Sequence, residues 1–242
     1  MFEAAAFWLQ CLSITTNNDQ AGITMNRRSF LHTTGIGSTA IALATVARAE
    51  AGEANSKSVP DGRTAFEFLG RSDQDGAQVT HYGYLTHIFG LADEQLFADL
   101  KVRTEATARF TFLAVTNLDS RHQHENIITT SAPGELTLFL KQNPGADFSD
   151  PASFARGKAI AAYSVRFHNV LNVQAPDQGI AAGSVELTQL SANAFALGDR
   201  RLRLGQPGLR ARLAANGSGT RTQVDPVRAF FLVGGHVVVI DS

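Results

Sequence analysis

The sequence predicts an all-β protein, and two observations lead to that prediction. Short runs in which apolar and polar residues alternate recur along the chain, and clusters of Gly, Asn, Asp and Pro separate them, as in half-buried strands joined by turns. An antiparallel β-barrel of roughly eight to ten strands with one or two short helices is expected, because closure leaves few strand edges exposed. A two-sheet β-sandwich is the alternative. The clearest alternating runs are Phe66–Phe68, Phe110–Ala114, Leu136–Leu140, Tyr163–His168 and Leu209–Leu213.

The segments between these runs carry signals of their own. Asp150–Gly157 starts with an acidic residue and Pro and ends with Gly, which predicts a helix of about one and a half turns. Leu91–Leu100 is a second candidate for a brief helix. Near the C-terminus, Asn216–Gly219 and Gly234–Gly235 are predicted to be hairpin turns, because glycine supplies the positive φ angles that tight turns require.

Composition limits the size and the partners of the protein. With 242 residues and 44% hydrophobic content, the chain is long enough for one sizeable core but not for two full domains. Its 21 basic and 22 acidic residues give a net charge of -1, so no overall field favours a nucleic acid. Phosphate loops, dinucleotide fingerprints and nucleophile elbows are absent from the sequence, and no cofactor is expected.

The segment Met25–Leu31 reads MNRRSFL, in which two adjacent arginines precede a polar residue, Phe and Leu. It resembles the twin-arginine signal peptides of exported bacterial proteins. A mildly apolar stretch follows and ends in a small-x-small sequence of the kind that signal peptidase cleaves. The residues that carry the resemblance are Arg27, Arg28, Phe30 and Leu31 for signal recognition, and Ala47 and Ala49 for cleavage.

This resemblance divides the chain into four parts. Residues 1–24 look unlike a signal and are expected to be a wrongly assigned extension upstream of the true start at Met25. The signal peptide covers 25–49, a flexible linker rich in Ala, Gly and Ser covers 50–63, and a single β-barrel domain covers 64–242. The alternative is an ordinary N-terminal helix whose arginine pair is a solvated charge cluster.

The resemblance also implies a route and a location. The expected partners during export are the twin-arginine translocase, which carries folded proteins, and signal peptidase, and the expected location is periplasmic or secreted. Gly35–Val46 is too short and too rich in small residues for a permanent anchor, so no stable membrane anchor is expected after cleavage. Cys11 and Trp8, each the single residue of its type, precede the signal, so the exported part would hold no disulfide and no thiolate metal site.

The densest cluster of side chains suited to binding or proton transfer lies within residues 80–88. In a strand, alternation would place His81, Gly83, Leu85 and His87 on one face, and Tyr82, Tyr84 and Ile88 on the other. Glycine at mid-strand indicates a bulge or a close approach by a ligand or by another backbone. The ligand-pocket candidates are therefore His81, Tyr82, Tyr84 and His87. The alternative is aromatic packing with satisfied hydroxyl groups.

His122 and His124 are weak candidates for metal ligands. In a strand they would project to the same face, whereas Glu125 would point the other way. The pair resembles the H-x-H element of cupins. A cupin also places a glutamate about four residues after the second histidine, where this chain has Thr129. No metal site is therefore predicted, and a polar loop over Asn117–Asn126 is the alternative.

The predicted domain as a whole resembles bacterial barrels of the allene oxide cyclase and dirigent type in its strand layout and in glycine-containing strand pairs such as Gly179–Thr188. No catalytic motif accompanies this resemblance. Three hypotheses follow: a barrel that binds a small apolar ligand in its interior, a cyclase- or isomerase-like enzyme, and a structural or partner-binding module. The first predicts a cavity, the second predicts convergent ionisable groups with shifted pKa values, and the third predicts a filled core with an exposed apolar patch.

Overall fold

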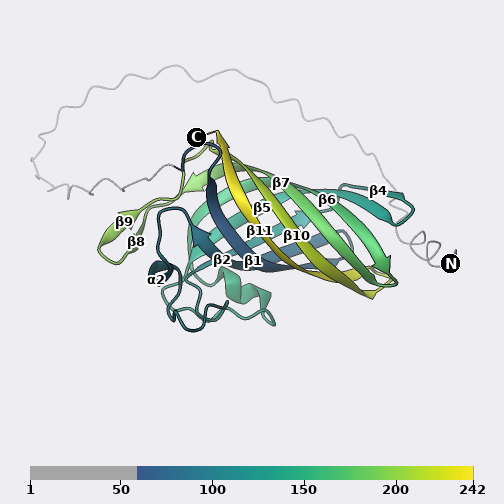
Figure 1. Ribbon diagram of the computed structural model, residues 1–242, viewed down its shortest axis with the longest axis horizontal. Helices are drawn as coiled ribbons and strands as arrows, with labels where there is room; N and C mark the ends of the chain where they lie inside the picture. The colour runs from purple at the N-terminus through teal and green to yellow at the C-terminus, as the bar shows by residue number, and fades with distance from the viewer. Residues whose placement is uncertain (1–58, 242) are drawn as a thin grey trace, which may run out of the picture. The chain divides into compact units, whose positions relative to one another are not determined.

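A computed structural model describes residues 59–241 of the protein (Figure 1). The twin-arginine segment Met25–Leu31 and the cleavage residues Ala47 and Ala49 lie outside the described residues. In the described part, no helix is long and apolar enough to cross a membrane.

Within residues 59–241, eight long antiparallel strands form a closed barrel, so the predicted barrel is confirmed and the sandwich alternative is not. Neighbours around the barrel follow chain order, and the pairing of β3 with β5 and of β1 with β11 closes the ring. The strands cross the barrel at a tilt (Figure 1). They are β1 (Thr64–Asp75), β2 (Gln78–Ile88), β3 (Phe110–Asn117), β5 (Ile127–Leu140), β6 (Lys158–Ala175), β7 (Gln178–Ala192), β10 (Arg210–Gln223) and β11 (Arg228–Asp241).

The remaining strands are short. The strand β4 (Ser120–His124) continues β3 along the same partner, because Thr116 pairs with Gly134 and, after an offset of one residue, Ser120 pairs with Ser131. The strands β8 (Phe195–Leu197) and β9 (Arg200–Leu202) form a separate hairpin. Both expected helices are present: α2 (Asp93–Leu96) and the 3-10 helix η1 (Pro151–Ala155), which follows Asp150.

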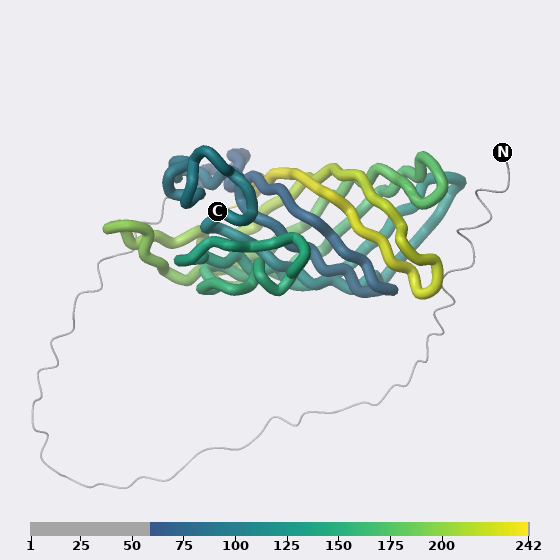
Figure 2. The backbone as a smooth tube through the Cα atoms, turned by 90° about the horizontal axis from the view of Figure 1, so that it is seen from below, coloured from purple at the N-terminus to yellow at the C-terminus, as the bar shows by residue number. Residues whose placement is uncertain are grey.

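The two ends of the barrel differ (Figure 2). The hairpin end carries four tight connections at residues 76–77, 125–126, 176–177 and 224–227. The loop end carries the long connections 89–109, 141–157 and 193–209, which contain α2, η1 and the β8–β9 hairpin. These loops therefore cover one end of the barrel only.

The loop-end half of the interior is a packed apolar core. Inward-facing side chains from all eight barrel strands contribute to it, and the loop residues Leu96 and Phe195 are at most 1% exposed. Burial of this surface is the main driving force for folding. Large members of the core include Phe66, Phe68, Leu85, Phe110, Phe112, Leu136, Leu138, Tyr163, Val165, Val185, Leu187, Leu213, Val237 and Val239.

Two predicted hairpin turns are wrong. Asn216–Gly219 lies inside β10, Gly234–Gly235 lies inside β11, and the turn between these strands is at residues 224–227. Steric contact explains the glycines. A Cβ atom would lie 2.2 Å from the Leu232 carbonyl oxygen at Gly217, and 2.2 Å from the Ala214 carbonyl oxygen at Gly235. These inward-facing glycines let the strands bend around the barrel, so here glycine marks curvature and not a turn.

A register shift in β2 changes the face of one predicted site residue. Leu85 pairs with Phe68 and faces inward, but His87 pairs with Glu67 and faces outward, because the β1–β2 register shifts between Glu67 and Phe68. Ile88 consequently lies in the core at 2% exposure. Simple alternation had predicted the opposite faces for His87 and Ile88, and the bulge overturns it.

Candidate functional site

The four predicted pocket residues lie on two sides of the barrel wall. His81 projects into the barrel interior, whereas Tyr82, Tyr84 and His87 project outward. The wall therefore separates His81 from the other three. Gly83 lies between the two tyrosines and faces inward, where a Cβ atom would lie 2.6 Å from the Gly70 Cα atom, so the predicted close approach of another backbone is confirmed.

His81 is the centre of a polar group inside the barrel. Its Nδ1 lies 2.7 Å from the Ser72 Oγ and its Nε2 lies 3.1 Å from the Thr116 Oγ1. The imidazole ring stacks on the Phe167 ring of β6, with a centroid distance of 4.3 Å and an interplanar angle of 8°. Because β6 lies across the interior from β2, His81 and Phe167 form the boundary of the packed core.

Both ring nitrogens of His81 therefore have a hydroxyl partner. Each hydroxyl group can donate to the ring or accept from it, and the Thr116 hydroxyl group also lies 3.4 Å from the Val79 carbonyl oxygen. Burial lowers the pKa of His81 to about 4, so the imidazole is neutral at neutral pH.

The side chains that face inward between His81 and the hairpin end differ from the core. Many of them are small or polar, and most are only half-buried, including the large apolar ones, whereas inward positions of the loop-end half are buried. We call this set the hairpin-end lumen. Its half-buried members are Gln74, Thr130, Phe167, Asn169, Leu171, Val173, Ala181, Gly183, Ala215, Gly217, Phe231 and Val233.

One ion pair lies near the hairpin end of this lumen. Arg221 continues the series of inward-facing residues in β10. Its side chain is 7% exposed. Its guanidinium group bonds to one carboxylate oxygen of Asp177, in the β6–β7 turn, through Nε at 2.7 Å and Nη2 at 2.5 Å. The lumen thus combines apolar walls, a neutral polar floor around His81 and a charged group at the hairpin end, a combination suited to a small amphiphilic molecule.

The outward-facing tyrosines are covered by the loops. Tyr82 is fully buried, and its ring packs against Phe148 and Phe154 beside η1. Its hydroxyl group donates to the Asp73 carboxylate over 2.6 Å, and Asp73 also pairs with Arg71. Burial, then this hydrogen bond, raises the pKa of Tyr82. These contacts fit the structural alternative, in which the hydroxyl group is satisfied and the ring is packed.

His122 and His124 both lie in β4 on the same outward face, as the spacing predicts, and both are exposed. Residues 59–241 contain no group of three or more His, Cys, Asp or Glu side chains arranged to hold a metal ion. The histidine pair consequently has no third ligand of these types close by in the described chain.

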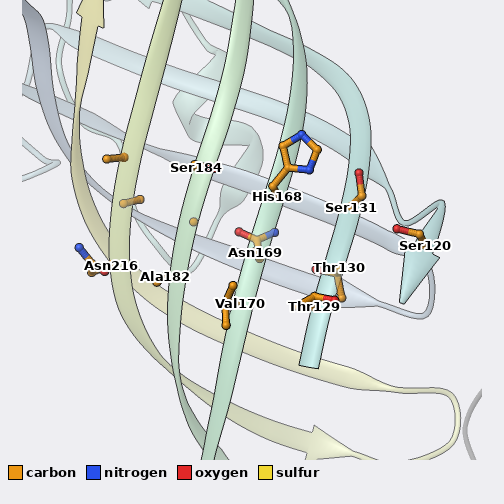
Figure 3. A pocket seen from close by; sticks show the side chains of 13 residues that line it. Ser120, Thr129, Thr130, Ser131, His168, Asn169, Val170, Ala182, Ser184 and Asn216 are labelled. Carbon is orange, nitrogen blue, oxygen red and sulfur yellow. The ribbon is translucent and has the colours of Figure 1, made fainter. Parts of the chain in front are cut away.

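A shallow hollow of about 440 Å³ lies on the outer wall at the hairpin end (Figure 3). Mainly outward-facing residues of β4, β5, β6, β7 and β10 line it, and none of them is Asp, Glu, Lys or Arg. Sequence reasoning missed this site, because its residues lie on five strands and only the register brings them together. The lining residues are Ser120, Thr129, Thr130, Ser131, His168, Asn169, Val170, Ala182, Gly183, Ser184, Ala214, Ala215 and Asn216.

Comparisons of the chain with protein-family models, with curated proteins and with solved structures found no match.

Proposed function

We propose that this chain is the precursor of an exported protein whose β-barrel binds a small, mostly apolar molecule in the hairpin-end lumen. The observation that carries the proposal is the contrast between the two halves of the interior. The loop-end half is a closed core, whereas inward-facing Phe167, Leu171 and Phe231 stay half-buried around a neutral polar floor. Half-buried apolar side chains that face inward offer a ligand surface that solvent now reaches.

The chemistry of the floor limits the ligand. Ser72 and Thr116 are hydrogen-bonded to the two ring nitrogens of His81, and all three groups are uncharged at neutral pH. Burying an ionised ligand group against such a floor is costly, so the group that reaches it is neutral, such as a hydroxyl or a carbonyl. The apolar body of the ligand would contact Phe167, Leu171 and Phe231.

Two neighbouring alanines of β7 provide a test. Ala181 faces into the hairpin-end lumen between Leu171 and Gly217, whereas Ala182 faces outward between Val170 and Asn216. We expect the fluorescence of N-phenyl-1-naphthylamine to rise saturably with the wild-type chain. The variant Ala181→Phe should weaken this binding by at least about tenfold, because the added ring occupies the lumen, whereas Ala182→Phe should bind normally.

Thermal unfolding shows whether both variants fold. If Ala181→Phe unfolds, Ala215→Phe adds a ring to the same lumen from β10 and replaces it. Equal weakening by the inward and outward substitutions, or none by either inward substitution, would contradict the proposal.

The export part rests on the twin-arginine segment and has its own test. Intact mass of the protein recovered from the periplasm of an expressing bacterium should correspond to a start at Glu50. The protein should disappear from the periplasm when Arg27 and Arg28 are both changed to Lys. An uncleaved cytoplasmic protein that the substitutions leave unaffected would refute the export route, but it would leave the binding proposal in place.

An isomerase-like activity is the second candidate, and one observation favours it. Two ionisable side chains of the barrel interior, His81 and Tyr163, have pKa values that burial shifts toward their neutral forms. A neutral imidazole with Ser72 on Nδ1 can exchange a proton with a bound molecule. If His81→Gln loses the isomerisation of a bound substrate but still binds N-phenyl-1-naphthylamine, the result would support an enzyme. An equal rate of isomerisation in the variant would exclude proton transfer by His81.

A further inference from the structure

The hollow on the outer wall has a regular floor made by two rows of side chains across the strands (Figure 3). Cross-strand pairing sets both rows, so neighbours within a row have Cβ atoms about 4.5–5.5 Å apart. The first row is Ser120, Ser131, His168, Ser184 and Ala214. The second row, two residues along each strand, is Thr129, Val170, Ala182 and Asn216.

The two rows differ in chemistry. The first offers hydroxyl groups and an imidazole, and the second places apolar Val170 and Ala182 between Thr129 and Asn216. Val170 is 44% exposed, although it is a large apolar side chain. The floor therefore presents a hydrogen-bonding strip beside an apolar strip, without a carboxylate, ammonium or guanidinium group.

Ser131 is an unsatisfied polar group at this floor. The residue is 8% exposed, and its Oγ is buried without a hydrogen-bond partner among residues 59–241. A buried hydroxyl group without a partner costs stability, and such groups in native proteins call for an explanation. Within the described part of the chain no hydrogen bond holds its rotamer, so the hydroxyl group can turn toward a ligand in the hollow.

We propose that this hollow binds a neutral oligosaccharide that lies across the strands. A pyranose ring has apolar C–H faces and a rim of hydroxyl groups, which match the apolar strip and the hydrogen-bonding strip. Neighbouring strands lie about 4.7–4.9 Å apart. This spacing is close to the length that each sugar ring adds to a linear glycan. The hollow, at about 440 Å³, lies within the size range of small-molecule sites. The uncharged lining favours a neutral sugar over an acidic one.

Calorimetric titration of the full chain with three neutral trisaccharides, cellotriose, maltotriose and tri-N-acetylchitotriose, tests the proposal. At least one of them should bind at millimolar concentration or below. Ala182→Phe places a bulky ring in the space that the sugar would occupy and should weaken that binding by at least about tenfold. Thr188→Phe, on the same outward face of β7 but outside the hollow, should bind as the wild type does.

A second variant separates recognition from structure. Ser131→Ala should weaken sugar binding by about fivefold, because one hydrogen bond is lost, yet it should leave the melting temperature unchanged or raise it, because the Oγ has no partner to lose. If Ser131 had only a structural role, the substitution would lower the melting temperature and leave sugar binding unchanged.

The proposal is overturned if none of the three trisaccharides binds, or if Ala182→Phe binds sugar normally. Weakening by Ala181→Phe and not by Ala182→Phe would also overturn it, because the sugar would then occupy the hairpin-end lumen. N-phenyl-1-naphthylamine binding by the same variants reports on the lumen separately, so either proposal can fail while the other stands.

Discussion

Tyr82 and Tyr84 lie on the same outward face of β2, but their hydroxyl groups have different surroundings. The Tyr82 hydroxyl group donates to Asp73, which also pairs with Arg71. The hydroxyl group of Tyr84 makes no hydrogen bond within the described residues, and its ring lies near Phe97. Both rings are buried, so the pair isolates the contribution of one hydrogen bond.

Replacing each tyrosine by Phe should separate the two environments. Tyr82→Phe should lower the free energy of unfolding by about 1–2 kcal/mol, because the hydrogen bond to a carboxylate is lost. Tyr84→Phe should change it by less than about 0.5 kcal/mol. Urea denaturation of both variants measures this difference, and an equal loss in the two would show that the Tyr82–Asp73 bond does not stabilise the barrel.

His81 should make the stability of the barrel depend on pH. Burial lowers its pKa to about 4, whereas an unfolded histidine titrates near 6.5. Between these values the unfolded chain binds more protons than the folded chain, so stability falls as pH falls from 6.5 toward 4. The stability that the barrel has while the buried His81 ring is neutral is therefore fully present above pH 6.5 and is lost progressively below it. The ring's contacts Ser72, Thr116 and Phe167 do not titrate in this range.

The expected size of this effect can be measured by urea denaturation at pH 7 and pH 5. The wild type should lose about 2 kcal/mol more between these pH values than His81→Gln, which carries no titrating ring. His236→Gln, at an exposed position of β11, should behave like the wild type. Equal losses in the wild type and His81→Gln would mean that His81 is as easily protonated in the folded barrel as in the unfolded chain.

At the scale of the elements, curvature of the long strands depends on glycines that face inward. Gly235 faces the interior, and an added Cβ would lie 2.2 Å from the Ala214 carbonyl oxygen, which the sheet holds in place. Gly234 faces outward, and its Cβ would meet the Leu69 Cδ2 atom at 3.1 Å, the mobile end of a side chain. Neighbouring glycines thus have opposite steric limits.

Alanine at each of these two positions tests the curvature. Gly235→Ala should lower the free energy of unfolding by about 1–3 kcal/mol, because the strand must shift to admit the methyl group. Gly234→Ala should be neutral or stabilising by up to about 1 kcal/mol, because the unfolded chain loses freedom. Thermal unfolding of the two variants measures this difference in stability. A larger loss of stability in Gly234→Ala than in Gly235→Ala would show that the bend in β11 does not depend on Gly235.

These glycines also show what the sequence could and could not predict. Alternation predicted the inward and outward faces of Tyr163–His168 correctly, and Pro after Asp150 predicted η1. Glycine pairs, however, occur both in tight turns and at bends in barrel strands, and only the partner strand distinguishes the two. The turn at residues 224–227 contains a Pro and no glycine, so the glycine criterion could not find it.

The candidate site was only partly predictable from the sequence, because the pairing of distant strands brings its residues together. His81 was identified because polar residue types gather in one segment. Its partners Ser72 and Thr116 lie nine and 35 residues away, and the stacked Phe167 lies on β6, across the interior. The sequence did not indicate the outer hollow, because each of its five strands contributes only one to three residues and these follow no motif.

At the scale of the whole molecule, the described barrel has a half whose inward-facing side chains are buried and a half in which most of them are only half-buried. Loops cover the loop end, and the large apolar side chains fill the interior beneath them. Toward the hairpin end, glycine or alanine stands at inward-facing Ala181, Gly183, Ala215 and Gly217, so short side chains line part of the interior there beside larger ones such as Phe167 and Phe231. The apolar burial that stabilises the fold is therefore concentrated in the loop-end half, and the proposed ligand site lies in the other half.

The measurement that bears most directly on ligand binding inside the barrel is the mapping of backbone amide shifts by NMR during titration with N-phenyl-1-naphthylamine. We predict that the shifted amides belong to residues of the hairpin-end lumen that do not line the outer hollow, among them Leu171, Ala181 and Phe231, and that amides of the loop-end core such as Phe110 keep their shifts. Shifts confined to the outer wall or to the loops over Tyr82 would contradict a ligand site in the barrel interior.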